Sequence, residues 1–202
     1  MSDYSPMFRS PITLPRPSAT STLASVTPAL GVSDLTGAQV TLIQGDAGDI
    51  LAKHFPAIPA KVGELVVVGQ GLLARLTPTE FYLFGRSPAA RLLSATQLDD
   101  GFKQAGRFAH ATDFTHGKAI LKLAGSASAE ALSKICGLDF HDSVFPNMQV
   151  KQSSAAKIKT LIARCDEDNI PTYYLHIDRS LGQYFFETLW DAGQEFGIVS
   201  II

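Results

Sequence analysis

From residue 38 onward, segments whose apolar residues have strand-like spacing alternate with segments of helical spacing. The first, AQVTLIQ at 38–44, alternates between apolar and polar side chains as a half-buried strand does. Apolar runs predict further strands at 64–69, 72–76, 80–85, 107–115, 118–125, 157–165, 172–178 and 198–202. Helices are predicted at 46–55, at 88–105 with Pro88 in the first turn, at 126–136 with Ser126 as N-cap, and at 180–196.

Two pairs of stretches resemble each other in the same order, which indicates an internal duplication. LLARLTPTEFYLFGRSPAARLL at 72–93 is similar to LIARCDEDNIPTYYLHIDRSLGQYFFETL at 161–189, where the turn is longer. Upstream, VTLIQGDAGDIL at 40–51 is similar to ILKLAGSASAEAL at 120–132. Each copy contains a strand and a helix, then a hairpin and a second helix.

This order of elements predicts an α+β fold of two pseudo-symmetric ferredoxin-like halves, about 37–107 and 108–202. The two halves together form one domain over residues 37–202. Leu83 and Leu175 are then expected at matching, buried positions in the two copies.

The first 36 residues differ in composition, with five prolines among many serines and threonines. Such a segment resists helix formation and is expected to be extended or irregular. It is either a flexible terminus or an arm that lays apolar side chains on another surface. The second interpretation predicts that the arm docks on a partner rather than on its own domain, with candidate contacts at Phe8, Arg9, Ile12, Leu14 and Arg16.

Composition narrows the class of protein. A chain of 202 residues with 46% hydrophobic residues and a formal charge of -2 is expected to fold, because disorder needs low hydrophobicity and high net charge. No long basic run is present, so nucleic-acid binding is not expected. No apolar run approaches the ~20 residues of a membrane span. Prolines stand where a signal peptide needs an apolar helix, so a cytoplasmic location is predicted.

Few residues suggest a catalytic or metal site. Cys136 and Cys165 are the only cysteines, and two reduced thiols are preferred over the single disulfide that they could form. They are too few and too far apart in sequence for a zinc site. No phosphate-binding loop, dinucleotide fingerprint or serine-nucleophile motif follows a predicted strand. No catalytic, cofactor-binding or metal-binding residue is therefore predicted in this chain.

One segment, ATDFTHGKAILKLAG at 111–125, brings an acid, a hydroxyl and a histidine together. Asp113, Thr115 and His116 are residue types that transfer protons in enzymes. Aspartate and threonine at the entrance to a strand also bind loose backbone N–H groups in turns. The structural interpretation is favoured, because no second histidine or metal-binding spacing accompanies His116.

The order of these motifs resembles the gamma subunit of heterotetrameric sarcosine oxidase, which is related to the folate-binding domain of the glycine-cleavage T-protein. The similar stretches are ATDFTHGKAILKLAG, SKICGLDFH, KTLIARC, TYYLHIDRS, GQYFFETLWDAGQEFG and, upstream, LLARLTPTEFYLFG. The resemblance covers roughly residues 38–197.

The resemblance implies a non-catalytic subunit of a complex that demethylates sarcosine to glycine, with hydrogen peroxide and 5,10-methylenetetrahydrofolate as the other products. FAD, FMN, NAD and tetrahydrofolate would belong to the larger chains. The partners would be alpha- and beta-type flavoprotein subunits and a small delta-type subunit. In T-proteins the chemistry depends on an acidic residue, and Lys159 and Thr160 stand at the place that resembles it. The chain alone is therefore expected to be inactive.

Two alternatives remain open. One is a stand-alone, T-protein-like protein that binds tetrahydrofolate, as a one-carbon carrier or a relative of the aminomethyltransferases. The other is a scaffold domain of an unrelated assembly.

Overall fold

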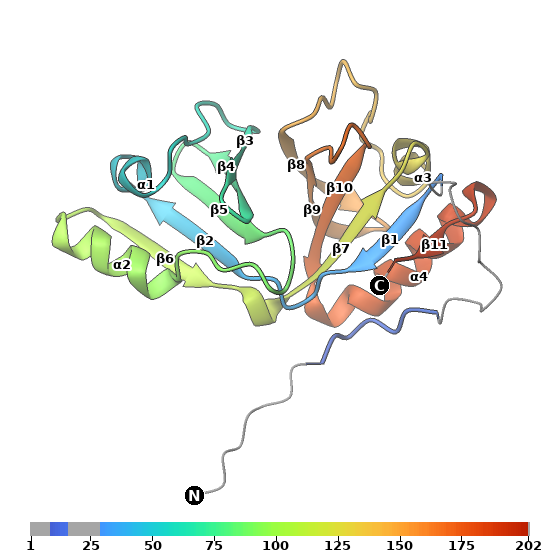
Figure 1. Cartoon of the computed structure of the whole chain (residues 1–202), viewed down its shortest axis with the longest axis horizontal. Coiled ribbons are helices and arrows are strands. Elements are labelled where there is room, and N and C mark those ends of the chain that lie inside the picture. The colour runs from blue at the N-terminus through green and yellow to red at the C-terminus, as the bar shows by residue number, and fades with distance from the viewer. Residues whose placement is uncertain (1–8, 16–28, 202) are drawn as a thin grey trace, which may run out of the picture.

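Two β-sheets face each other, and each carries its helices on the outer side (Figure 1). The computed structural model describes residues 9–15 and 29–201. The N-terminal sheet has the order β3 (Leu65–Val68), β4 (Gly71–Thr77), β5 (Glu80–Gly85), β2 (Val40–Gly45) and β6 (Ala109–Asp113). The C-terminal sheet has the order β11 (Val199–Ser200), β1 (Gly31–Asp34), β7 (Lys118–Ala124), β10 (Thr172–Asp178), β9 (Ile158–Arg164) and β8 (Gln149–Ala155).

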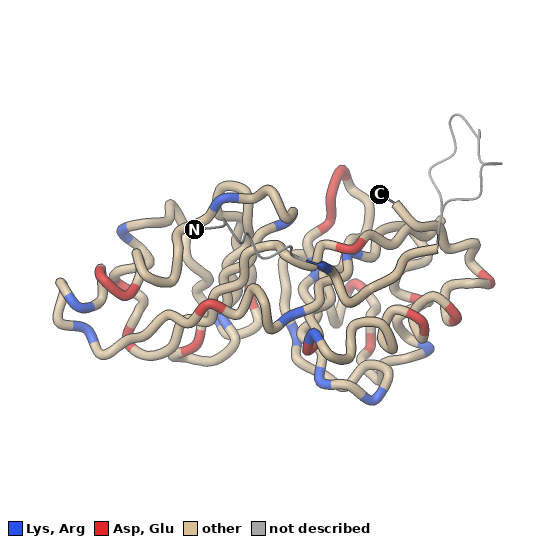
Figure 2. The backbone as a smooth tube through the Cα atoms, turned by 90° about the horizontal axis from the view of Figure 1, so that it is seen from below, with Lys and Arg blue, Asp and Glu red and all other residues tan. Residues whose placement is uncertain are grey.

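Over the residues described, four α-helices complete the layers. The N-terminal sheet is covered by α1 (Gly48–His54) and α2 (Ala95–Gln104), and the C-terminal sheet by α3 (Ser128–Ser133) and α4 (Gly182–Gly193) (Figure 1). Basic and acidic residues are interspersed over both halves (Figure 2).

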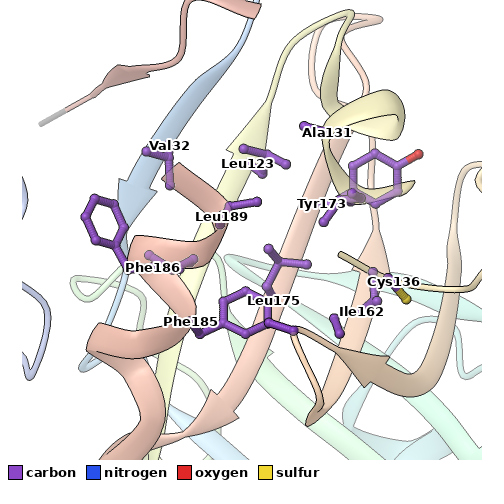
Figure 3. Close-up of a cluster of buried hydrophobic side chains, with 14 of the residues drawn as sticks. Val32, Leu123, Ala131, Cys136, Ile162, Tyr173, Leu175, Phe185, Phe186 and Leu189 are labelled. Atoms are coloured by element: carbon purple, nitrogen blue, oxygen red, sulfur yellow. The ribbon is translucent and has the colours of Figure 1, made fainter. Parts of the chain in front are cut away.

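The buried side chains form three clusters, because alternate residues of a strand point to opposite faces of its sheet. In β5, Phe81 and Leu83 point toward the helices, whereas Tyr82 and Phe84 point toward the other sheet. Each sheet thus has one core under its helices, and the two share a third core between them. In β10, Leu175 belongs to the outer core, where Phe185 and Leu189 of α4 contact the sheet (Figure 3).

The predicted α+β fold with two ferredoxin-like halves is confirmed. In the N-terminal half, β6, β2, β5 and β4 have the strand order of a ferredoxin-like sheet, with β3 added at the edge. The two copies also have the same register, because Leu73 pairs with Leu83 and Ile162 pairs with Leu175. Leu83 and Leu175 are both fully buried, as the duplication predicted.

One strand belongs to the sheet of the other half: β1 (Gly31–Asp34) precedes the N-terminal half in the sequence but lies in the C-terminal sheet. Residues 31–34 were predicted to lie in an irregular arm ending at residue 36, but they form β1. This strand pairs with β7, Val32 opposite Leu123, and separates β7 from β11. The side chain of Val32 is fully buried in the C-terminal outer core, which is why this part of the chain is ordered as a strand.

The arm also contacts its own domain. Ile12 is only 8% exposed and belongs to the C-terminal outer core. The backbone N–H of Thr13 donates to Oε1 of Gln183 at 2.7 Å, and the Arg179 guanidinium donates to the carbonyl of Arg9. Residues 9–15 therefore bind the N-terminal end of α4, so the prediction that the arm does not dock on its own domain is wrong for them. A contact between their exposed side chains and a partner stays a prediction.

Some local predictions also need correction. The helix predicted from residue 88 begins only at Ala95, because Ser94 forms a capping box with Gln97. Ser126 is not an N-cap, since α3 begins after Ala127 and no side chain caps it. The strand β8 was not predicted, because its sequence QVKQSSA carries few apolar residues.

The duplication predicts equal costs for emptying its two matching leucine sites. Leu83→Ala and Leu175→Ala should each lower the free energy of unfolding by about 2–5 kcal/mol, the range for a well-packed buried leucine. Urea denaturation measures both. The exposed Val67 offers a control, because Val67→Ala should change stability by less than about 0.5 kcal/mol. A near-neutral result at only one leucine would contradict the equivalence of the two sites.

Candidate functional site

A cavity of about 300 Å³ lies between the two sheets, and we call it the inter-sheet cavity. Residues of both halves contribute to its walls, so neither half forms it alone. Its lining residues are Leu42, Leu76, Glu80, Tyr82, Phe114, Lys118, Gln152, Lys159, Leu161, His176 and Asp178. Apolar and aromatic walls combined with a few polar groups are typical of small-molecule sites.

His176, in the middle of β10, is the buried polar group of this cavity. Its side chain is nearly inaccessible, and its ring lies against Phe84 with the ring centroids 4.5 Å apart. Nδ1 lies 3.4 Å from the hydroxyl of Tyr82, whereas Nε2 is buried and has no hydrogen-bond partner among the described residues. Because unpaired buried polar atoms are uncommon, Nε2 marks a place where a ligand or water would gain a hydrogen bond.

Burial also sets the charge of these groups. It lowers the pKa of His176 from 6.5 to about 3, and the positive charge of Lys118 acts in the same direction. Burial likewise raises the pKa of the Tyr82 phenol, with the negative charge of Asp178 adding to the effect. Both groups are therefore neutral at physiological pH and can act only as hydrogen-bonding groups.

The rim of the cavity carries charges of both signs. Nζ of Lys118 forms an ion pair with Oδ1 of Asp178 at 2.5 Å, and Glu80 accepts a hydrogen bond from Gln44 at 2.7 Å. Lys159 lines the cavity and is exposed. Glu80 and Asp178 lie on β5 and β10 rather than on the strand of Lys159, and so the motif around Lys159 gave no sign of these carboxylates.

Thr160, the other residue of that pair, contributes nothing to the cavity walls. It is fully buried, and its hydroxyl donates to the carbonyl of Ile158 at 3.0 Å. Although β9 carries no acidic residue, Glu80 and Asp178 of other strands place carboxylates at the cavity.

The segment that includes Asp113, Thr115 and His116 is a crossover between the halves. The backbone N–H of Thr115 donates to Oδ1 of Asp113 at 2.8 Å, and Oγ1 of Thr115 accepts from the N–H of Val40 at 3.0 Å. His116 is exposed and is not among the residues that line the inter-sheet cavity. The aspartate and threonine thus fix the backbone of a turn.

The other crossover, between β1 and β2, has the same arrangement. The N–H of Thr36 donates to Oδ1 of Asp34 at 2.9 Å, and Oγ1 of Thr36 accepts from the N–H of Ile120 at 3.1 Å. Val40 and Ile120 are matching positions of the duplication. The motif Asp-Phe-Thr at 113–115 is therefore a second copy of Asp-Leu-Thr at 34–36, which accounts for it without catalysis.

Of the residues predicted to contact a partner, the structure describes Arg9, Ile12 and Leu14. Ile12 is buried in its own domain, and Leu14 is half-buried against the same core. Arg9 is exposed. Phe8 and Arg16 lie outside the described residues.

Other classes of site find little support in residues 9–15 and 29–201. Over these ranges no three His, Cys, Asp or Glu side chains are placed to hold a metal ion. Cys136 and Cys165 are free and buried, and burial raises the pKa of the Cys165 thiol. None of the helices described is both long enough and apolar enough to cross a membrane.

Removing the turn hydrogen bonds should affect stability. Asp113→Ala and Thr115→Val should each lower the free energy of unfolding by about 1 kcal/mol, the net contribution of one hydrogen bond. Asp100→Ala, at an exposed acid of α2, serves as the control and should be close to neutral. Chemical denaturation measures the free energy of unfolding of each variant. Unchanged stability in both crossover variants would contradict the structural role.

The buried imidazole should make stability depend on pH. The unfolded chain binds a proton at His176 near pH 6.5, but the folded chain does so only near pH 3, so stability falls as pH drops through this range. His176→Phe copies Phe84, the matching residue of the other half. Between pH 7 and pH 5, the free energy of unfolding of this variant should fall by about 2 kcal/mol less than that of the wild type.

Urea unfolding at both pH values measures this difference. His54→Gln, at an exposed histidine, should retain the pH dependence of the wild type. The same pH dependence in His176→Phe and the wild type would show that the imidazole is protonated in the folded chain.

Comparisons with known proteins agree with this architecture. A chain of a heterotetrameric sarcosine oxidase from Corynebacterium sp. U-96 is similar, with a TM-score of 0.70 and 23% identity over 88% of this chain and 90% of that one. The glycine cleavage system aminomethyltransferase T from Bartonella henselae gives a TM-score of 0.66 and 14% identity over 86% of this chain. The match spans only 48% of that chain, about half its length.

These identities are low, so the two structures show the fold. A search of curated proteins gives no match. The family model described as the GCVT N-terminal domain matches residues 63–201, which is more than half of the chain. The chain therefore belongs to the family of the GCVT N-terminal domain.

Proposed function

We propose that this chain is a gamma-type subunit of a sarcosine oxidase-like complex and that it has no catalytic residues of its own. One observation carries the proposal: the match to the sarcosine oxidase chain extends over nearly all of both chains. That chain is therefore about as long as this one, as expected for a corresponding subunit. The aminomethyltransferase matches over only half its length.

In this proposal the complex demethylates sarcosine to glycine and forms hydrogen peroxide and 5,10-methylenetetrahydrofolate. FAD, FMN and NAD are held by the larger alpha- and beta-type subunits, and a small delta-type subunit completes the assembly. The present chain supports the alpha-type subunit. The candidate contacts with this partner are Phe8, Arg9, Leu14 and Arg16. Ile12 is buried in the core of its own domain.

Tetrahydrofolate is tested separately, because the family relationship implies folate binding and the inter-sheet cavity lies in this chain. The residues fit a flat heteroaromatic ring: Leu42 and Leu161 give apolar walls, Tyr82 and Phe114 give aromatic ones, and His176 has an unpaired Nε2. Lys159 at the rim could bind a carboxylate. Bound there, the folate would supply a nitrogen acceptor for the one-carbon unit.

The volume limits this fit. About 300 Å³ is at the lower end of the range for small-molecule sites, enough for the ring system rather than for a whole folate. Folate binding by this chain alone is therefore the second candidate function, and the unpaired Nε2 of His176 favours it.

Affinity purification of the tagged chain from its native source tests the main proposal. The eluate should show flavin absorbance and should release hydrogen peroxide when sarcosine is added. The isolated recombinant chain, as control, should be colourless and inactive toward sarcosine. Elution without a flavoprotein, or sarcosine-dependent peroxide from the isolated chain, would contradict the proposed role.

Equilibrium dialysis of the isolated chain with tetrahydrofolate separates the second candidate. Binding that His176→Phe abolishes would place the folate ring in this chain. Absence of binding would leave folate to the larger subunits, as the main proposal has it.

A further inference from the structure

We propose that a second cavity between the two halves binds a small zwitterion of the amino-acid class, with its carboxylate on Arg86 and its ammonium group on Asp168. This cavity, which we call the Arg86 cavity, has a volume of about 580 Å³. It is lined by Gly69, Gln70, Arg86, Ser87, Lys122, Asp166, Glu167 and Asp168. None of these residues carries an apolar side chain, so the cavity suits a small polar molecule, in contrast to the inter-sheet cavity.

The duplication shows why Arg86 is available to a ligand. Its match in the C-terminal half is Asp178, since each stands four residues beyond the paired tyrosines, Tyr82 and Tyr174. The charge of Asp178 is balanced by Lys118 on the neighbouring strand. The residue that matches Lys118 is Ala38, which cannot balance the charge of Arg86.

The guanidinium of Arg86 is accordingly left without a carboxylate partner. Its Nε is buried and finds no acceptor among the described residues, and no ion pair there includes its side chain. A buried donor without an acceptor is costly, and a bound carboxylate would satisfy it with a charge-assisted hydrogen bond.

Further donors lie on the same wall. The side-chain oxygen of Gln70 accepts from the N–H of Arg91 at 3.0 Å, which orients the amide and leaves its NH₂ group to donate. The hydroxyl of Ser87 is next to Arg86 in sequence and also lines the cavity. This wall, from the N-terminal half, therefore favours a negatively charged oxygen group.

The opposite charge comes from the turn between β9 and β10 in the other half. Two of its three acids are already paired: Asp166 accepts from Nε of Arg164 at 3.0 Å, and Glu167 accepts from Lys122 and Tyr174. Although burial opposes it, these two hydrogen bonds and the positive charges of Lys122 and Arg86 hold the pKa of Glu167 below its usual value. Asp168 has no ion pair or hydrogen bond in the described part of the chain, so it is the acid left to bind a cation.

Arg86 and the exposed Asp168 thus present charges of opposite sign in one cavity, and neither forms an ion pair within the described residues. Where the structure is described, they form no ion pair with each other within 4.0 Å, and both line the same cavity of about 580 Å³. An anion alone would meet repulsion from Asp168, and an amine alone would meet repulsion from Arg86. A molecule that carries both charges satisfies both residues.

Calorimetric titration of the full chain with three molecules of matched size tests this. L-alanine carries both charges, propionate only the carboxylate and ethylammonium only the cation. L-alanine should bind at least about tenfold more tightly than either, since each charge-assisted contact is worth about one decade of affinity.

Two variants test which residue binds the carboxylate and which binds the ammonium group. Arg86→Gln should weaken L-alanine at least about tenfold and abolish propionate binding. Asp168→Asn should weaken L-alanine while leaving propionate unchanged or slightly tighter. Asparagine suits this position, because the backbone of Asp168 has a φ of 50°, which asparagine adopts readily. Lys53→Gln, at an exposed lysine of α1 that lines neither cavity, is the control and should change none of these affinities.

Thermal unfolding of each variant shows whether it is folded at the titration temperature. Equal affinity for L-alanine and propionate would overturn the assignment, because Asp168 would then have no role. Absence of any binding of L-alanine to the wild type up to about 50 mM, an affinity too weak for a formed site, would also overturn it.

Discussion

The packing of the two sheets against each other is the constraint on which the rest of the structure depends. Each sheet covers its outer face with its own helices, but its inner face carries side chains such as Tyr82 and Tyr174 that must be removed from water. Each half has only enough helices for one face, so the two inner faces can be covered only by one another. Both cavities are places where this packing is incomplete, and each therefore depends on both halves.

The duplication explains how much of this could be predicted from the sequence. The aligned copies predicted that Leu83 and Leu175 occupy matching buried positions, which is confirmed. The two hairpins also share one register, because register follows the alternation of buried side chains. The strands β1 and β8 were missed because they are short or polar, and what orders them is pairing with strands distant in the sequence. Such pairing leaves no local signal.

The candidate site was harder to predict than the fold. His176 lies within the apolar strand TYYLHID and was not identified as a site residue, since a single histidine is usually part of the core. The aligned copies do contain a signal, because His176 takes the place of Phe84, and a polar residue there has no packing reason. Likewise Arg86 matches Asp178, and Lys118 matches Ala38. Comparing the two halves position by position shows where duplication kept the packing and where the chemistry diverged.

The position of β1 in the C-terminal sheet has a consequence for folding during synthesis. During synthesis β1 leaves the ribosome before any strand with which it pairs, since β7 and β11 lie far later in the sequence. All five strands of the N-terminal sheet are complete before β7 appears, so that half can form first while β1 waits unpaired. The buried Val32 and Leu30 then join the later half only when β7 arrives. The first strand of the described residues thus cannot pair with β7 until more than 80 further residues have been made.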